Sequence, residues 1–162
     1  MKILGIDNGL DGGLVMLDDN LIIGRLVMPT IDAPNGKGRE YNIPFILDAL
    51  ESWKPERAVI ERAQAMPGQG VTSMFSIGKG FGIMLGILAA RAIPYEIVHP
   101  RTWQKMILAD MSRTDTKAAS VLVAQRLWPG VDWRATERCK KAHDGLTDAA
   151  CIAEWGRRRF RE

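Results

Sequence analysis

Cysteine and histidine are scarce in this sequence, which contains two of each among 162 residues. Cys139 and Cys151 form no CxxC pair, and with only His99 and His143 beside them the spacing does not fit a structural zinc site. Free thiols and the lack of a secretory signal predict a protein of the reducing cytoplasm. Long hydrophobic runs are also missing. The most apolar stretch, Phe81 to Ala90, is about ten residues, too short to span a bilayer, so we expect no membrane partner.

The net charge is only +3, but the charge is unevenly distributed. Residues 1–60 carry 6 Lys/Arg and 9 Asp/Glu, a net charge of −3, whereas residues 61–162 carry 16 and 10, a net charge of +6. A basic second part suits an acidic partner such as nucleic acid, although a solvated, lysine-rich surface would give the same count. With 46% apolar residues and no internal repeat, residues 1–162 are most simply one folded domain.

The first apolar run, Ile3 to Asp7, is short and interrupted by glycine, which predicts a buried strand rather than a helix. Asp7 ends this strand, where an ionised carboxylate is costly unless something compensates its charge. A metal ion is one such compensation, and the glycines of the following turn would let a phosphate backbone come close. The predicted strand from Arg57 to Glu61 ends on an acid in the same way, which indicates a shared site.

The apolar pattern predicts the other elements of the fold. Gly12–Leu17 and Leu21–Met28 complete a three-strand meander around the turn at Asp18–Asn20. Further along, the pattern predicts a strand over 95–98 and helices over 43–53, 71–93, 101–108, 114–127 and 144–159. The predicted fold class is α/β, with a mixed sheet (an antiparallel three-strand meander plus parallel strands) flanked by helices.

Residues 29–40 contain prolines and glycines and show no periodicity, which predicts a flexible surface loop. Lys37 and Arg39 in this loop either contact phosphates or are solvated. In the helix over 71–93, Gly78, Gly82 and Gly86 recur at four-residue spacing, although each glycine costs about 1 kcal/mol in a helix interior. Close approach of another backbone would explain this, and we expect the sheet rather than a second subunit.

Four acids form the candidate catalytic set. Asp144 and Asp148 lie on one face of the last helix, where like charges weaken a helix. A helix cap and a first-turn acid would each account for one of them. With Asp7 and Glu61 they suit a hard cation that prefers oxygen ligands, Mg²⁺ or Mn²⁺. Such a set can hold two ions about 4 Å apart, one to generate the attacking hydroxide and one to stabilise the leaving 3′ oxygen of a phosphodiester.

Three motifs carry a family resemblance: Gly5-Ile6-Asp7-Asn8-Gly9, Val59-Ile60-Glu61 and His143-Asp144-Gly145-Leu146-Thr147-Asp148-Ala149-Ala150. In this order they resemble the RuvC family of Holliday-junction resolvases, of the kind also found in bacteriophages. The resemblance runs from one end of the chain to the other. It implies an RNase H-like fold, a homodimer, and paired metal-dependent nicks in opposed strands of a four-way DNA junction. It also implies that Asp7, Glu61, Asp144 and Asp148 are the catalytic acids, with His143 able to share the role of Asp144.

The resemblance extends to DNA contacts. Lys117, and Lys105 in the run that begins at Arg101, resemble family lysines that meet the scissile phosphate region, and Lys117 is counted as catalytic too. Exposed helix lysines are the alternative. Residues 64–70 fall where resolvases place side chains into the junction centre, and without an aromatic there the wedge would be Met66 or Gln64. Of the tryptophans, Trp155 is expected in the core, and no role follows for Trp103, Trp128 or Trp133.

Two other classes of function stay open. The run Asp7-Asn8-Gly9 with Gly12-Gly13 also resembles the first phosphate loop of actin-like ATPases and sugar kinases. Those proteins need a second such domain, for which 162 residues leave no room, so we expect no nucleotide cofactor. A catalytically silent DNA-binding protein on the same fold is the other class, against which the complete acidic set argues. Other branched DNA or an RNA–DNA hybrid also remain open as substrates of a nuclease.

Overall fold

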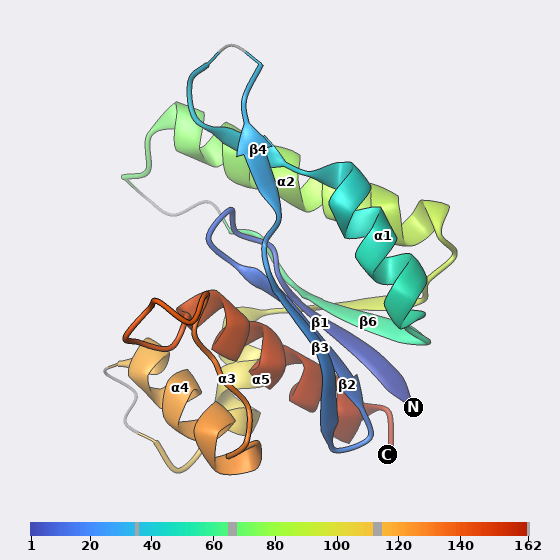
Figure 1. Ribbon diagram of the computed structural model, residues 1–162, viewed down its shortest axis with the longest axis vertical. Helices are drawn as coiled ribbons and strands as arrows, with labels where there is room; N and C mark the ends of the chain where they lie inside the picture. Colours follow the sequence, from blue (N-terminus) through green and yellow to red (C-terminus); the bar gives the residue numbers. More distant parts are fainter. Residues whose placement is uncertain (35, 65–67, 112–114, 162) are drawn as a thin grey trace.

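A five-stranded sheet lies between two layers of helices in the computed structural model, which describes residues 1–34, 36–64, 68–111 and 115–161 (Figure 1). The strand order across the sheet is β3-β2-β1-β6-β7. These strands are β1 (Lys2–Asp7), β2 (Gly13–Asp18), β3 (Leu21–Val27), β6 (Arg57–Glu61) and β7 (Tyr95–Val98), and a separate hairpin consists of β4 (Thr30–Asp32) and β5 (Arg39–Tyr41). The helices are α1 (Ile43–Trp53), α2 (Val71–Ala90), α3 (Pro100–Ile107), α4 (Thr116–Leu127) and α5 (Asp144–Arg159).

The sheet is mixed. Strands β1, β2 and β3 form an antiparallel meander, and β1, β6 and β7 run parallel to one another. The parallel strands are connected through α1 and α2, because parallel neighbours need a crossover connection rather than a tight turn. The predicted fold class, a meander plus parallel strands flanked by helices, is therefore confirmed.

Alternation along β1 divides its side chains between two hydrophobic cores. Leu4 and Ile6 are fully buried in the core that α1 and α2 cover, whereas Ile3 is fully buried in the core formed with α3, α4 and α5. Gly5 lies on the α5 side, and a Cβ there would be 2.0 Å from the carbonyl oxygen of Ala149. Glycine at this position therefore lets α5 pack directly on the backbone of β1, which places the start of α5 near the end of that strand.

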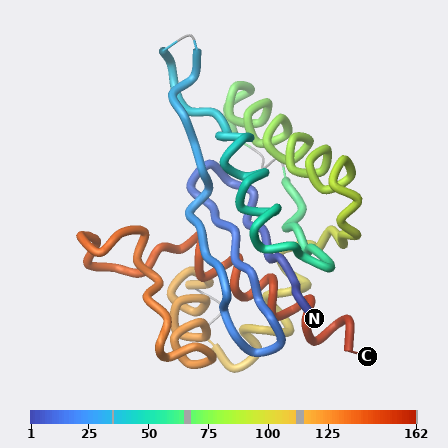
Figure 2. Tube along the Cα trace, turned by 45° about the vertical axis from the view of Figure 1, so that its right-hand side comes forward, coloured from blue at the N-terminus to red at the C-terminus, as the bar shows by residue number. Residues whose placement is uncertain are grey.

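Residues 29–40, predicted from the sequence as a flexible surface loop, instead contain most of a β-hairpin. Strands β4 and β5 pair as an antiparallel hairpin, which rises away from the sheet (Figure 2). Gly36 and Gly38 adopt φ values of +69° and +86° at its end, a conformation that glycine permits at little cost. Tyr41 is buried at the hairpin base and donates its hydroxyl hydrogen to the backbone oxygen of Asn8. The hairpin is thus anchored beside the turn that follows β1.

The glycine stripe of α2 does not face the sheet, so that prediction is wrong. A Cβ added to Gly78, Gly82 or Gly86 would meet nothing within 4 Å in the described part of the chain. The closely packed glycine is instead Gly80, where a Cβ would lie 2.4 Å from the hydroxyl oxygen of Tyr41. Helix α2 thus packs into the core on one side and leaves its glycine stripe open on another.

The exposed side of α2 is apolar as well as open. Val71 and Phe75 lie on the glycine stripe at three- and four-residue spacing, and they are 79% and 72% exposed. Helix α2 has 20 residues, whereas the apolar stretch noted in the sequence, Phe81 to Ala90, has only about ten. By length and composition alone, the whole helix could cross a membrane. Met84 and Leu88 of the same helix are nevertheless fully buried in the protein core.

Candidate active site

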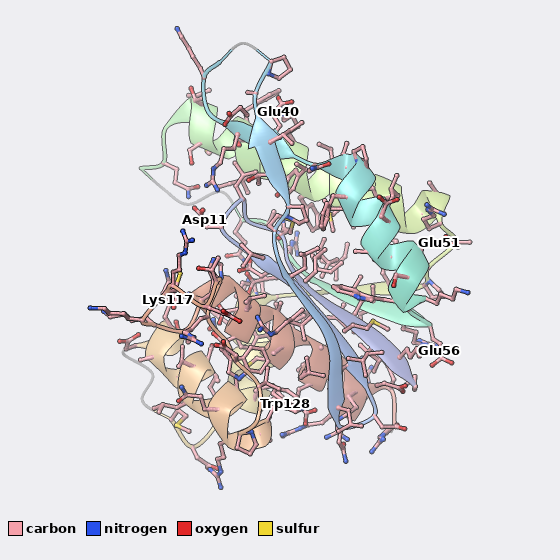
Figure 3. All side chains as sticks on the ribbon, viewed as in Figure 1. Asp11, Glu40, Glu51, Glu56, Lys117 and Trp128 are labelled. Atoms are coloured by element: carbon pink, nitrogen blue, oxygen red, sulfur yellow. The ribbon has the colours of Figure 1, made fainter. Side chains whose placement is uncertain are left out.

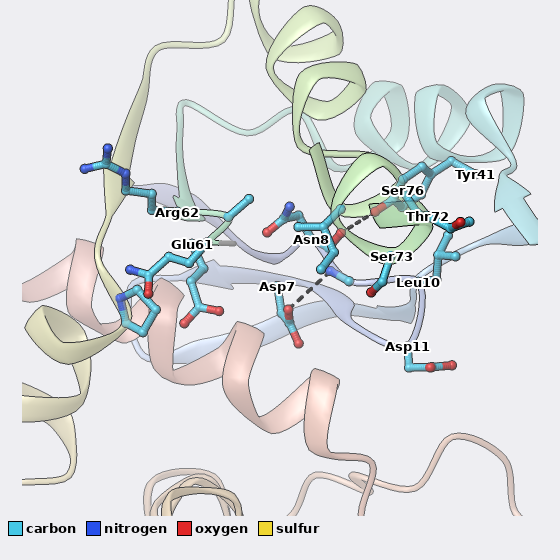
Figure 4. Close-up of a pocket in the computed structure, with 15 residues that line it drawn as sticks. Asp7, Asn8, Leu10, Asp11, Tyr41, Glu61, Arg62, Thr72, Ser73 and Ser76 are labelled. Carbon is cyan, nitrogen blue, oxygen red and sulfur yellow. Dashed lines mark hydrogen bonds between the residues drawn. The ribbon is translucent and has the colours of Figure 1, made fainter. Parts of the chain in front are cut away.

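Asp7 and Glu61 lie at the carboxyl ends of neighbouring parallel strands. Ile6 pairs with Ile60 in register, and each acid follows its isoleucine as the last residue of the strand. The isoleucines belong to the core under α1 and α2, so alternation directs both acids to the opposite side of the sheet. Figure 4 shows the two carboxylates pointing the same way, toward α5.

Glycine contacts bring the start of α5 onto the turn after β1. A Cβ on Gly145 would lie 2.5 Å from the backbone of Gly12, and a Cβ on Gly13 would lie 2.9 Å from the carbonyl oxygen of Gly145. Gly13 therefore makes room for the start of α5, whereas a Cβ on Gly12 would lie 2.1 Å from the backbone oxygen of Asp7 within the turn itself. The close approach of a phosphate backbone to these glycines stays a prediction. The contact of α5 with this turn carries Asp144, which precedes Gly145, and Asp148, about one helical turn further along α5, toward the two strand-terminal acids.

Burial raises the pKa of three of the acids, and repulsion from a neighbouring carboxylate adds to the rise in each of them. Burial raises the pKa of Asp7, against the hydrogen bond that the Gly9 N–H donates to its Oδ1 atom at 3.3 Å. Burial also raises the pKa of Glu61 to about 7, and the charge of Asp7 adds to this rise. The pKa of Asp148 is likewise raised to about 7 by burial and by the charges of Asp7, Glu61 and Asp144. Acids that influence one another in this way are attractive ligands for a cation.

Two basic side chains face the acids. The Nζ atom of Lys117, in the first turn of α4, lies 3.4 Å from Oδ2 of Asp144. His143 is the residue that precedes α5, and its Nδ1 atom is buried without a hydrogen-bond partner in the described structure. The charges of His143 and Lys117 oppose the burial that raises the pKa of Asp7. The structure therefore places Lys117 beside Asp144, and its contact with a scissile phosphate stays a prediction.

Sequence reasoning missed two side chains that contact these acids. The indole N–H of Trp103 donates a hydrogen bond to Oε1 of Glu61 at 2.7 Å. The hydrogen bond between the side chains of Ser120 and Asp148 opposes the burial that raises the pKa of Asp148. Trp103 comes from α3 and Ser120 from α4, so no local spacing in the sequence links either residue to its acid.

A cavity of about 720 Å³ opens beside Asp7 and Glu61 (Figure 4). Its walls come from the turn after β1, the loop after β6 and the first turns of α2. Gln64, one of the predicted DNA contacts, lines this cavity, and its side-chain amide contacts Nε2 of His99. The cavity wall also carries the hydroxyls of Thr72, Ser73 and Ser76.

The hairpin places one predicted DNA contact near the acids. Arg39 is bound to Asp11, with 2.7 Å between Nη2 and Oδ1, so it reaches the turn that follows β1. Lys37 is exposed at the end of the hairpin. Figure 3 shows Asp11 and Lys117 on the same side of the molecule in this view.

The other predicted DNA contacts are more distant from the carboxylates. Arg101 and Lys105 are exposed residues of α3, each two positions from Trp103. Two positions correspond to about 200° around a helix, so both side chains project from the side opposite to the one that reaches Glu61. Met66 lies outside the described residues.

The four acids are of the type that binds a divalent cation, but their side chains are not arranged around a common point. Among the residues that the structure describes, no three acidic, histidine or cysteine side chains are close enough together to hold a metal ion as they stand. Their oxygen ligands and unbalanced buried charge nevertheless suit a hard divalent cation.

The fold and the site together define an α/β protein with a cluster of carboxylates where the sheet meets a helix. Its fold is that of RuvC. The chain is similar to Thermus thermophilus RuvC, with a TM-score of 0.69, 20% identity and coverage of 99% of this chain and 96% of that one. It is equally similar to T. thermophilus RuvC in complex with a Holliday junction substrate, with a TM-score of 0.68, 18% identity and the same coverage.

A third similar structure is the yeast mitochondrial Holliday junction resolvase Ydc2, with a TM-score of 0.62, 17% identity and coverage of 96% of this chain and 77% of that one. No protein-family model matches the sequence, and no curated protein matches it significantly. The RNase H-like fold that the three motifs implied is therefore confirmed by three-dimensional similarity, at identities where sequence similarity is weak.

Proposed function

We propose that this protein is a metal-dependent endonuclease that resolves four-way DNA junctions. The observation that carries the proposal is the group of acids around Asp148, whose pKa is raised by the charges of Asp7, Glu61 and Asp144, on a fold shared with RuvC and Ydc2. We propose further that residues 1–162 act as one domain in a reducing cytoplasm, which the free thiols of the two cysteines support.

The four acids would hold Mg²⁺ or Mn²⁺, two ions for each site. Such ions supply an activated water and stabilise the leaving oxygen of a phosphodiester. The chain's own contribution is to orient oxygen ligands around the reacting phosphate. Lys117 now pairs with Asp144 at 3.4 Å, and it would turn to the scissile phosphate once a cation occupies the acids. In this proposal Lys117 acts on the reaction more than on affinity.

DNA would lie across the side of the molecule that carries the acids, the hairpin and the basic second part of the chain. Arg39 and Lys37 would contact phosphates from the hairpin, and Gln64 would face the DNA from the wall of the cavity. Arg101 and Lys105, on the outer side of α3, would reach a neighbouring arm of the junction. Contacts of this kind make affinity fall steeply with salt concentration.

A homodimer would place two such sites on opposed strands, and α2 offers a surface for it. The open glycine stripe lets a second helix backbone approach closely, and Val71 and Phe75 beside it are 79% and 72% exposed. Substitution of Phe75 with Ser should shift the protein from dimer to monomer in light scattering coupled to size exclusion. A dimer that persists unchanged would place the interface elsewhere.

The experiment that tests the proposal compares an end-labelled four-way junction with a linear duplex and an RNA–DNA hybrid, each in Mg²⁺, Mn²⁺ or EDTA. We expect symmetrical, metal-dependent nicks in the junction alone. Glu61→Gln should abolish cleavage and keep junction binding, whereas Glu51→Gln, which changes an exposed acid of α1, should leave both cleavage and binding unchanged. Tight binding without cleavage of any substrate would favour a silent DNA-binding protein, and cleavage of the hybrid or of other branched DNA would change the substrate class.

A further inference from the structure

Trp103, on the buried side of α3, donates a hydrogen bond to Glu61, one of the candidate catalytic acids. Trp103 is 1% exposed, and its indole N–H donates to Oε1 of Glu61 over 2.7 Å. An indole has a single hydrogen-bond donor and no acceptor. The contact therefore occupies Oε1 and leaves Oε2 of the same carboxylate available to another ligand.

Packing fixes the direction in which Trp103 donates. Its ring belongs to the hydrophobic core with Ile3, Val59 and Ile107, and the helix that carries it begins directly after β7. His99 holds that helix start, because its Nδ1 atom accepts the Arg101 backbone N–H at 3.2 Å. A ring held on all sides keeps its donor in one place, and the carboxylate must adapt to it.

The other buried tryptophans differ from Trp103 in the partner of the indole nitrogen. Trp128 is 7% exposed, and its indole donates to the backbone oxygen of Asn20 at 2.9 Å, at the turn between β2 and β3. The indole nitrogens of Trp133 and Trp155 have no partner in the described structure. Trp103 thus binds an acid of the candidate site, whereas Trp128 makes a similar bond to backbone elsewhere.

We propose that Trp103 is a positioning residue, which holds the carboxylate of Glu61 in the orientation that binds a divalent cation. This inference rests on the proposed metal-dependent nuclease function. Without the indole donor, Glu61 rotates freely and its oxygen is no longer directed toward the other acids. Loss of partners that orient metal ligands typically weakens metal binding or activity by about 10- to 100-fold.

The test measures Mn²⁺ affinity by titration calorimetry on the full chain without DNA, for the unsubstituted protein, Trp103→Phe and Trp128→Phe. Both variants exchange a buried indole for a smaller ring and lose one hydrogen bond, so Trp128→Phe is a matched control for Trp103→Phe. Trp103→Phe should weaken Mn²⁺ binding about tenfold and lower kcat on the junction, with the junction Kd in EDTA unchanged. Trp128→Phe should bind Mn²⁺ within about twofold of the unsubstituted chain.

Equal Mn²⁺ affinities of the unsubstituted protein and a folded Trp103→Phe would overturn the inference and leave the nuclease proposal standing. If the unsubstituted chain neither binds Mn²⁺ nor cuts a junction, the nuclease proposal fails and this inference fails with it. Should Trp103→Phe not fold, the indole ¹H–¹⁵N signals decide. Glu61→Gln and Mg²⁺ should each shift the Trp103 signal and leave the Trp128 signal in place, and an unmoved Trp103 signal would refute the role.

Discussion

Neutralising Asp148 should stabilise the metal-free protein while it impairs the site. Burial, together with the charges of Asp7, Glu61 and Asp144, raises the pKa of this carboxyl to about 7 from an ordinary value of 3.8. Asp148→Asn keeps the shape of the side chain and a hydrogen-bonding group for Ser120, but it removes the charge. The variant therefore removes the cost of burying a charge at position 148, together with the repulsion that this charge meets from the neighbouring acids.

The structure sets the size and the sign of this effect. A pKa of about 7 against 3.8 in the unfolded chain corresponds to about 4 kcal/mol in the free energy of unfolding. Because the folded pKa is the higher one, the stabilising protonation is fully present below about pH 4 and is lost as the pH rises through about 7. Asp148→Asn does not titrate, so its stability relative to the unsubstituted protein should grow by about 4 kcal/mol between pH 4 and pH 8.

Urea unfolding in EDTA, followed by tryptophan fluorescence at several pH values from 4.5 to 8, measures this difference directly. Glu51→Gln is the control, because Glu51 is 67% exposed and its ion pair with Arg91 is worth less than about 1 kcal/mol. Unfolding free energies of the unsubstituted protein and Asp148→Asn that run parallel across this pH range would refute the reasoning. Saturating Mg²⁺ should reverse the order, since the ion stabilises only the chain that binds it.

Three further predictions follow from the site and its packing. Lys117→Ala should lower the cleavage rate constant about tenfold and change the junction Kd in EDTA less than about twofold, because a charge-assisted contact to the reacting phosphate acts mainly in the transition state. Equal losses in cleavage rate and in junction affinity would place Lys117 on a general DNA-binding surface. Mn²⁺ affinity should fall as the pH drops below about 7, by about tenfold per pH unit for each proton that the ion displaces. The reason is that Glu61 and Asp148 have pKa values of about 7 and bind the ion only when they are deprotonated. Calorimetry at pH 6 and pH 8 measures this difference, and equal affinities would exclude both acids as ligands. Gly5→Ala should destabilise the fold by about 3 kcal/mol or more in urea unfolding, because its Cβ would lie 2.0 Å from the Ala149 carbonyl oxygen; a native-like midpoint would show that α5 can move away from β1.

The elements that could be predicted from the sequence are those with a strong local signal. A short apolar run that ends on an acid identified β1 with Asp7 and β6 with Glu61. The start of α5 and its two acids also agree with the predicted helix over 144–159. The hairpin over residues 29–41 escaped prediction, because its strands are only three residues long and depend on the burial of Tyr41 beside Asn8.

By itself, the sequence determined the mixed sheet and placed an acid at the end of β1 and of β6, because apolar periodicity is a local property. That these acids bind Mg²⁺ or Mn²⁺ stays a prediction. Only the tertiary structure decided which surfaces meet. Periodicity cannot tell which side of a helix is covered, so the outward stripe of Gly78 and the inward contact of Gly80 look alike in sequence. The same holds for Trp103, whose donor meets Glu61 across 42 residues because a sheet and a helix pack together there.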